Sequence, residues 1–437
     1  MENPAPFTIT ESEPKQYVVY KIRWLILAIF VALSLSNAFQ WIQYSIITDI
    51  IIEYYGVSST TVNWLSILYM ITYPPLIFPG TWFLQKYGLR TSILIGAFGN
   101  MVGTAIKCFS VHPDRFWVTF AGQFTTASSQ IFILGIPAQL AATWFGPDQV
   151  STACALGVFG NQLGIAIGFL IPPAIVHHSN IAGGLRTMFY SVAGIGAALF
   201  VLIIFIFKEK PKTPPSAAAA MGNEADQGSY IDCILRLLKN KRYVLLLISY
   251  GMNAAAFYAI STLLGQIFLL HFPGDNENAG RIGLVLVLSG MCGSVICGII
   301  LDKTGKFKIV ALTVYIMSLV FMIVFTFIFQ TNTMWLVYVV SCLLGAFMTG
   351  YLPVGFEFAA ELTYPESEGL SSGLLNASAT GIGTVCTYAS GELLNAYGDV
   401  PANLLLVAVL VVGTILTALI KEDLRRQAAR SENPHSE

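Results

Sequence analysis

The sequence has few charged residues for its length. Only 11% of its 437 residues are Asp, Glu, Lys or Arg, and 55% are hydrophobic, whereas soluble proteins carry about 25% charged residues. The net charge is −1, and no basic tract suited to nucleic acid is present. This composition excludes a soluble globular domain and a nucleic-acid-binding protein. It predicts an all-α membrane protein embedded in a lipid bilayer.

Motifs for metal, redox or covalent chemistry are also missing. The seven cysteines are scattered, six of them in apolar segments, and form neither a disulfide framework nor a metal motif. None of the five histidines, and no Lys or Arg, lies in the middle of an apolar segment. We therefore expect no cofactor and no metal. An enzyme is not expected either, because a membrane transferase would need an interior His or acid–base pair.

Twelve apolar segments approach the roughly 20 residues needed to cross a membrane. They lie at about 24–48, 62–84, 91–110, 116–145, 151–176, 187–207, 243–270, 281–301, 309–330, 334–361, 370–393 and 401–420. A polar linker, residues 208–242, separates the sixth from the seventh and ends in a basic, amphipathic piece. The sequence thus predicts two six-helix halves, 24–207 and 243–420, with tails at 1–23 and 421–437.

Basic residues predict the orientation of the chain in the membrane. If the amino terminus is inside, 19 of the 23 Lys and Arg residues fall in cytoplasmic segments. The four on the other side are Lys107, Arg115, Arg186 and Arg281. Cytoplasmic loops carry an excess of Lys and Arg, so we expect both termini in the cytoplasm. Residues 1–20 are polar and contain Glu11 and Glu13, which argues against a cleavable signal peptide.

A loop with Gly and charged residues recurs after the second span of each half. The first copy contains Gly88 and Arg90; the second, 217 residues later, contains Asp302, Gly305 and Lys308. Glycine permits a tight turn, and the charges can pin neighbouring helix ends in one conformational state. Two such loops at matching positions in a twelve-span chain resemble the major facilitator superfamily. The resemblance implies a substrate site between the halves near the midplane, and transport by alternating access.

Polar and aromatic residues lie within spans, where lipid-facing helices seldom carry them. On a continuous helix Asn37, Trp41 and Tyr44 are at i, i+4 and i+7 and share one face. Further polar positions in the fourth, fifth and eleventh spans include Gln130, Gln162 and Thr380. Such residues either bind a ligand or form hydrogen bonds between helices, and spacing alone leaves both interpretations open.

Carboxylates are nearly absent from the spans. Glu357, about one turn from the cytoplasmic end of the tenth span, is either an ion-coupling site or, as we favour, the partner of a loop Lys or Arg. No chain of titratable groups for a proton relay can be assembled, so facilitated uniport is the simpler hypothesis. A neutral, aromatic-lined chamber suits a quaternary ammonium, since a desolvated cation–π contact contributes about 2 kcal/mol.

Several longer runs resemble one family within this superfamily. They include residues 37–44, 158–170, 257–264 and 361–369. Over residues 20–420 the chain is similar to the feline leukaemia virus subgroup C receptor family. The resemblance implies transport of choline and of ethanolamine, with haem as the alternative substrate. We expect a monomer in the plasma membrane.

The same resemblance implies roles for individual residues. Trp41 and Tyr258 align with the aromatic residues that hold the choline ammonium, and Gln130 aligns with a cavity glutamine near the substrate. A further family glutamine aligns with Thr380, whose shorter side chain departs from the pattern. Gln162, which the internal repeat places opposite Thr380, is the candidate to replace it.

Two alternatives to choline transport remain open. Haem iron favours His, Cys or Tyr ligands, and His177-His178 in an outer loop is the candidate pair, although paired loop histidines are usually solvated. A sensor or receptor for a soluble partner would need a sizeable extracellular domain. The outer loops have about a dozen residues or fewer, which favours transport.

Overall fold

The structure is a computed structural model that describes residues 17–146, 148–216, 219–220 and 229–432. The ends of both predicted tails, residues 1–16 with Glu11 and Glu13 and residues 433–437, lie outside the described residues. Within the predicted linker, residues 217–218 and 221–228 lie outside them too. Every long element of the described chain is a helix, as the composition predicts. The first six spans are formed by α1 (Ile22–Ile42) with α2 (Thr48–Tyr55), α3 (Ser59–Tyr87), α4 (Leu89–Cys108), α5 (Phe116–Ser129) with α6 (Ile131–Leu134) and α7 (Pro137–Trp144), α8 (Val150–Ile175) and α9 (Ile181–Ile206). The later helices are α11 (Tyr230–Lys239), α12 (Lys241–His271), α13 (Asn276–Thr304), α14 (Phe307–Ile328), α15 (Met334–Thr363), α16 (Glu368–Tyr397), α17 (Asp399–Leu419) and α18 (Arg425–Glu432).

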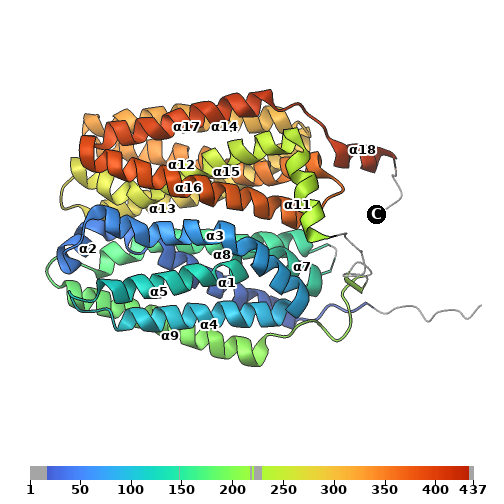
Figure 1. Cartoon of the computed structure of the whole chain (residues 1–437), viewed down its shortest axis with the longest axis horizontal. Coiled ribbons are helices and arrows are strands. Elements are labelled where there is room, and N and C mark those ends of the chain that lie inside the picture. The colour runs from blue at the N-terminus through green and yellow to red at the C-terminus, as the bar shows by residue number, and fades with distance from the viewer. Residues whose placement is uncertain (1–16, 147, 217–218, 221–228, 433–437) are drawn as a thin grey trace, which may run out of the picture.

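The long helices form two layers that face each other. Figure 1 shows α1–α9 in one layer and α12–α17 in the other, with their axes running along the long direction of the molecule. Within the described chain, ten helical segments are long and apolar enough to cross a membrane. The two remaining predicted spans are the broken segment α5–α7 and the more polar α16. We call the end of the bundle with α2 the α2 end, and the end with α7, α11 and α18 the α11 end (Figure 1).

The first span is longer than predicted and is interrupted. α1 ends at Ile42, a 3-10 turn covers Ser45–Ile47, and α2 continues to Tyr55. The predicted shared face is found only in part: Asn37 and Tyr44 both reach α5, whereas Trp41 contacts Tyr258 of α12. The turn directs the carbonyl groups of residues 45 and 46 toward Gly265 of α12, where a Cβ atom would lie 3.0–3.1 Å from their oxygens. This close approach of two backbones favours glycine.

The fourth span is also broken. α5 ends at Ser129, the short α6 follows, and α7 begins at Pro137. Proline lacks the N–H that an uninterrupted helix would use, and it is favoured at the first position of a new helix. Gln130 lies at the first break, and its carbonyl group accepts hydrogen bonds from the N–H groups of residues 133 and 134. The fourth span thus places Gln130 at an irregular point of the backbone.

Small residues let the helices within the first layer pack closely. Gly160, Gly164 and Gly168 of α8 lie along α1, where added Cβ atoms would come within 2.3–2.9 Å of α1 atoms. Close approach at small residues is how helices associate where lipid offers no hydrophobic driving force. This stripe fixes α1, and with it Trp41, against α8.

Candidate functional site

Trp41 of α1 and Tyr258 of α12 meet where the two layers face each other. Their ring centroids are 5.6 Å apart and their planes make an angle of 82°. Trp41 is 6% exposed and Tyr258 is half-buried. The indole Nε1 has no hydrogen-bond partner among the described residues. The two rings make the edge-to-face contact that aromatic pairs prefer, and it joins the two layers.

α3 and α16 complete the surroundings of this aromatic pair. A Cβ atom added to Gly383 of α16 would lie 3.1 Å from the Tyr258 ring and 3.2 Å from Sδ of Met70 on α3. Oγ1 of Thr387 lies 3.8 Å from the same sulfur. Four helices therefore converge here, and Gly383 leaves the space that Tyr258 and Met70 occupy.

The predicted polar residues differ in how close they lie to the aromatic pair. Nε2 of Gln130 donates to the carbonyl of Tyr69 at 2.5 Å, one residue from Met70. Thr380 lies one turn before Gly383, and its hydroxyl donates to carbonyl groups of its own helix. Gln162 lies on α8 between the glycines that contact α1, with its Oε1 buried and unpaired among the described residues. Gln130 and Thr380 thus contact chain segments next to the aromatic pair, but no described contact joins either side chain, or Gln162, to the two rings.

The side chains of Asn37 and Tyr44 are hydrogen-bonded inside the first layer. Nδ2 of Asn37 lies 3.2 Å from Oδ1 of Asn100 and 3.1 Å from the carbonyl of Thr126. The hydroxyl of Tyr44 is bonded to that of Thr119. These contacts are the interhelical hydrogen bonds that were the alternative to a ligand site. Both side chains hold α1 to α4 and α5, while Trp41 reaches α12.

Lys107 is a buried cation near the end of a span, which is compatible with the prediction that no Lys or Arg lies in the middle of one. It lies in the last turn of α4 and is 1% exposed. Its Nζ donates to Oε1 of Gln40 at 2.8 Å and lies 5.7 Å from the ring centroid of Tyr44. Because the predicted span 91–110 contains this residue, the sequence could have indicated that its side chain is buried. The ammonium group lies within the first layer, and no described contact joins it to Trp41 or Tyr258.

The middle of the bundle contains no ion pair among the described residues. Those that the structure shows lie at helix ends and loops of the α2 end, such as His271–Asp399, or of the α11 end, such as Arg236–Glu366. Within the part of the chain that the structure describes, Trp41 and Tyr258 therefore meet away from the carboxylates that form ion pairs. Such surroundings can hold a cation through aromatic faces rather than through an opposite charge.

Hydrogen bonds between the two layers gather on the α2 side of the aromatic pair. They join Ser66 to Thr262 (2.7 Å), Asn63 to Gln266 (2.6 Å), Asp49 to Asn276 (2.9 Å), Thr60 to Glu392 (2.7 Å) and Ser59 to Asn395 (2.8 Å). Gly283 of α13 also packs directly on the ring of Phe169. The two layers are thus closed against each other at the α2 end.

His178 belongs to this closed end, and the expectation of a merely solvated loop histidine is wrong. Its Nε2 lies 2.9 Å from Asp49 and its Nδ1 lies 2.5 Å from Glu53, both on α2. The hydrogen bond with Glu53, together with Asp49, raises the pKa of His178 above its ordinary value. Asp49 in turn accepts from Asn276 of the other layer, so the protonated imidazole supports a contact between the layers.

We expect this interaction to make stability depend on pH. Because the pKa of His178 is raised in the folded state, its contribution is complete below the unfolded value of 6.5 and is lost as the pH rises through the folded value. The melting temperature of the purified protein should therefore fall more steeply above about pH 6.5 in the wild type than in His178→Gln. His177→Gln is the matched control and should retain the wild-type slope; equal slopes for all three proteins would contradict the interaction.

The loop with Gly88 and Arg90 ties two helix ends together at the α11 end. Gly88 has a φ of 87°, and a Cβ atom there would collide with the carboxylate of Glu209. That carboxylate accepts from the N–H groups of Leu89 and Arg90 at 2.8 and 2.7 Å. The Arg90 guanidinium donates to the carbonyl of Phe207, just after α9, at 2.8 Å. An anion thus caps the start of α4 and a cation the end of α9, as the helix dipoles favour.

The second copy of the loop has a weaker version of the same arrangement. Gly305 has a φ of 60° and ends α13, and the N–H group of Lys308 lies 3.4 Å from the carboxylate of Glu422. Asp302 is exposed in the last turn of α13, and the structure shows no bond to its side chain from a described residue. The repeat therefore extends to an acidic residue that follows the last helix of each half.

Removing these caps should have unequal effects. Glu209→Ala deletes two short hydrogen bonds at the start of α4, so we expect a loss of about 1–2 kcal/mol in stability. Glu422→Ala deletes one long contact and should cost less. Thermal unfolding of the two purified variants beside the wild type measures the difference, and a larger loss in Glu422→Ala would contradict the assignment of Glu209 as a cap.

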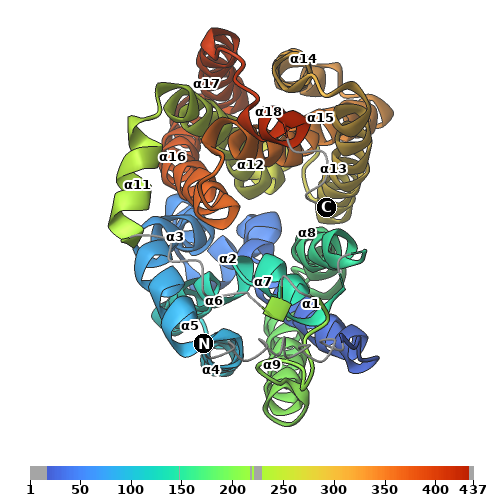
Figure 2. The same ribbon diagram turned by 90° about the vertical axis from the view of Figure 1, so that its right-hand side faces the viewer.

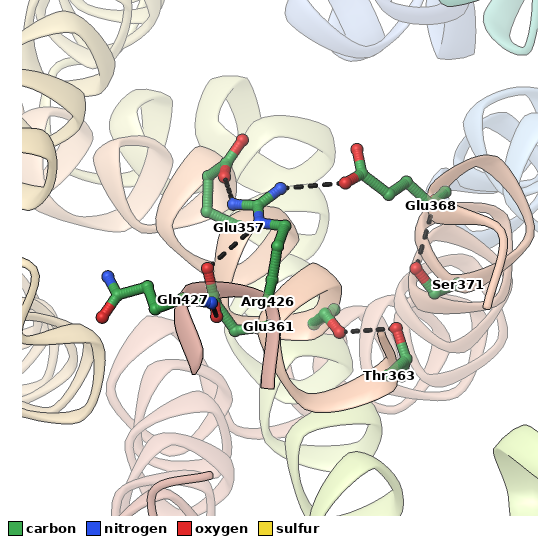
Figure 3. A network of polar contacts seen from close by, with 8 residues as sticks. Glu357, Glu361, Thr363, Glu368, Ser371, Arg426 and Gln427 are labelled. Carbon is green, nitrogen blue, oxygen red and sulfur yellow. Dashed lines mark hydrogen bonds and ion pairs between the residues drawn. The ribbon is translucent and has the colours of Figure 1, made fainter. Parts of the chain in front are cut away.

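Glu357 pairs with a residue of the carboxyl-terminal tail. Figure 3 shows the guanidinium of Arg426, on α18, between three carboxylates. It lies 2.6 Å from Glu357, 3.0 Å from Glu361 and 2.9 Å from Glu368. Glu361 is 1% exposed and also accepts from the N–H group of Gln427. The sequence did not reveal Glu361 and Arg426, because their pairing depends on where the tail folds back.

Comparisons with known proteins agree with this architecture. The family model of the Major Facilitator Superfamily matches residues 29–385. A bacterial homologue of the lysosomal transporter Spinster, solved in an inward-facing and unoccupied conformation, has a TM-score of 0.71 at 12% identity and covers 92% of this chain and 96% of its own. The fucose:proton symporter FucP in the outward conformation has a TM-score of 0.65 at 14% identity, with 92% and 100% covered. These likenesses show that the chain shares the overall fold of those structures.

Curated relatives are much more similar in sequence. The choline/ethanolamine transporter flvcr2a of Danio rerio is 52% identical over 420 residues, which cover 95% of this chain and 89% of that protein. The choline/ethanolamine transporter FLVCR2 of Homo sapiens is 48% identical over 430 residues, with 96% and 82% covered. FLVCR1 of Felis catus, which bears the same description, is 49% identical over 425 residues, with 95% and 76% covered. The chain is thus a membrane transporter rather than an enzyme, and it belongs to the FLVCR family of the major facilitator superfamily.

Proposed function

We propose that this transporter carries choline, and ethanolamine with it, across the membrane. The observation that carries the proposal is the aromatic pair Trp41–Tyr258, which joins the two layers in surroundings free of described ion pairs. A quaternary ammonium has no N–H to donate and gains most from aromatic faces. The descriptions of relatives that are 48–52% identical to this chain support the same substrates.

The two rings must separate to receive a substrate. At a centroid distance of 5.6 Å they are in contact, so a trimethylammonium group does not fit between them in this conformation. When the layers move apart, each ring offers a face to the cation. Gln130, whose Nε2 is held by Tyr69, keeps its Oε1 as an acceptor for the hydroxyl of choline. Thr380 on α16 is a further candidate with a short side chain, and Gln162 stays a secondary candidate.

Alternating access follows from the distribution of contacts between the layers. We propose that the halves 24–207 and 243–420 rock against each other about the midplane, and that the chain outside them does not take part in this movement. We propose that the closed α2 end, with its hydrogen bonds such as Asn63–Gln266, belongs to a state in which substrate exchanges at the α11 end. We propose that both termini are cytoplasmic, in a plasma-membrane protein acting as a monomer, so this state faces inward.

Uniport without ion coupling is the mechanism we favour. Glu357 is engaged by Arg426 at the α11 end, and Lys107 is bonded to Gln40 inside the first layer. A proton relay needs a chain of titratable groups along the path, and the described residues around Trp41 and Tyr258 do not provide one. The loops with Gly88, Arg90, Asp302, Gly305 and Lys308 would then serve the conformational change rather than ion binding.

Uptake into proteoliposomes tests the proposal. Purified protein should carry radiolabelled choline down its own gradient, with identical ion concentrations on both sides, and unlabelled ethanolamine should compete. Titration of the purified protein with choline and with haemin separates the substrates. Saturable binding of haemin without binding of choline would overturn the proposed substrate. Choline uptake that requires an imposed proton or sodium gradient would contradict the uniport mechanism.

A further inference from the structure

α11 has an orientation that the spanning helices do not share. It lies across the end of the bundle, roughly perpendicular to the long helices (Figure 1), and it runs along the outer rim when the molecule is viewed from the α11 end (Figure 2). One residue separates it from α12, which starts at Lys241. A helix with this orientation lies in the plane of the membrane, at the height where the spans leave it.

α11 presents two apolar faces. Cys233 and Leu237 are buried against the rest of the protein. Ile231, Leu235 and Leu238, at i, i+4 and i+7, form a second stripe that is 47–64% exposed. A soluble surface helix would carry polar residues there. An apolar stripe exposed at the level of a membrane surface is covered by the acyl boundary of the bilayer.

Basic residues surround a groove beside α11. The groove has a volume of about 470 Å³, and five of its lining residues are the cations Arg236, Lys239, Lys241, Arg242 and Arg425. The loop after α15 contributes one acidic residue to the lining, Glu366. A groove of this size with an excess of positive charge is suited to a phosphate-bearing headgroup.

Ion pairs already use part of this charge. Arg236 is bonded to Glu366 at 2.6 Å, and its hydrogen bonds lower the pKa of that carboxyl group, which stays ionised. Asp423 pairs with Arg242 at 2.6 Å and with Arg425 at 2.8 Å. Lys239 and Lys241 are exposed, and the described part of the chain offers them no carboxylate within ion-pair distance. These two lysines are therefore available to a ligand.

We propose that α11 is a membrane-surface helix whose apolar stripe enters the bilayer and whose basic groove binds the headgroup of an anionic phospholipid through Lys239 and Lys241. The acyl chains of that lipid pass along Ile231, Leu235 and Leu238. An anionic lipid can contact both the exposed apolar stripe and the adjacent lysines that lack a carboxylate partner. Free phosphate would contact the lysines only. This site is separate from Trp41 and Tyr258 and does not depend on what is transported.

Binding of a fluorescent short-chain phosphatidylserine to the detergent-purified full chain tests the site. Each lysine near a membrane surface contributes about 5-fold to binding of anionic lipid, so Lys239→Gln/Lys241→Gln should weaken binding about 30-fold. Lys208→Gln/Lys210→Gln removes two exposed lysines outside the groove and should bind as the wild type does. Equal affinities for the two double variants would overturn the proposal.

Two further arms separate lipid from free phosphate. Leu235→Gln/Leu238→Gln leaves the cations in place and should also weaken phosphatidylserine binding; unchanged binding would overturn the insertion of the stripe. Glycerophosphoserine, which has the headgroup but no acyl chains, should compete poorly. Competition at equal concentration would show that the groove binds phosphate compounds without a lipid, which contradicts the proposal.

Discussion

Alanine in place of Trp41 is expected to abolish choline uptake by expressing cells while the amount of protein at the surface is retained. The substitution removes the indole face, whose attraction for a desolvated cation is about 2 kcal/mol, or about 30-fold in Kd. It also removes the contact with Tyr258 across the layers. Uptake of radiolabelled choline, normalised to surface protein, measures the effect.

Two controls make this result specific. Trp117→Ala removes a tryptophan that is 68% exposed on α5 and should leave uptake unchanged. Trp41→Phe keeps an aromatic face, and because Nε1 has no described hydrogen-bond partner, this variant should retain part of the activity. Full choline uptake by Trp41→Ala would contradict the role of Trp41 in binding the substrate.

Removing Arg426 is expected to destabilise the protein by about 3–5 kcal/mol, because it leaves a buried carboxylate without its partner. That carboxylate is Glu361, which is 1% exposed and lies 3.0 Å from the guanidinium. Thermal unfolding of detergent-purified Arg426→Ala measures the loss. The double variant Arg426→Ala/Glu361→Gln should recover part of it, since the buried charge is then gone.

Arg425 provides the matched control for this experiment. It precedes Arg426 on the same helix, but its ion pair with Asp423 is partly exposed, and such pairs contribute about 0–1 kcal/mol. Arg425→Ala should therefore melt close to the wild type. Equal melting temperatures for Arg425→Ala and Arg426→Ala would show that α18 does not hold Glu361 in solution.

The sequence predicts the spans well because burial in a membrane leaves a continuous apolar run. The predicted segments 243–270 and 309–330 correspond to α12 (Lys241–His271) and α14 (Phe307–Ile328) within two residues at each end. The interruptions at Tyr44 and Gln130 were not predicted. The first depends on the close approach of Gly265 from another helix, and a contact between distant segments leaves no local pattern in the sequence.

The candidate site was predictable in part. The depth of Trp41 and its partner Tyr258 followed from the sequence and the family resemblance, and the structure brings the two rings together. Periodicity grouped Asn37 and Tyr44 with Trp41, but it could not tell which neighbour each side chain meets. Lys107 was assigned to the outer side of the predicted span 91–110, but its burial at 1% exposure was not predicted.

A structure determined with bound choline tests the central claim most directly. We expect density for the trimethylammonium group within about 6 Å of the indole face of Trp41, with the Tyr258 ring on another side and no carboxylate in contact. Density against a carboxylate, or a Trp41 indole turned into the lipid while choline lies elsewhere, would contradict the account.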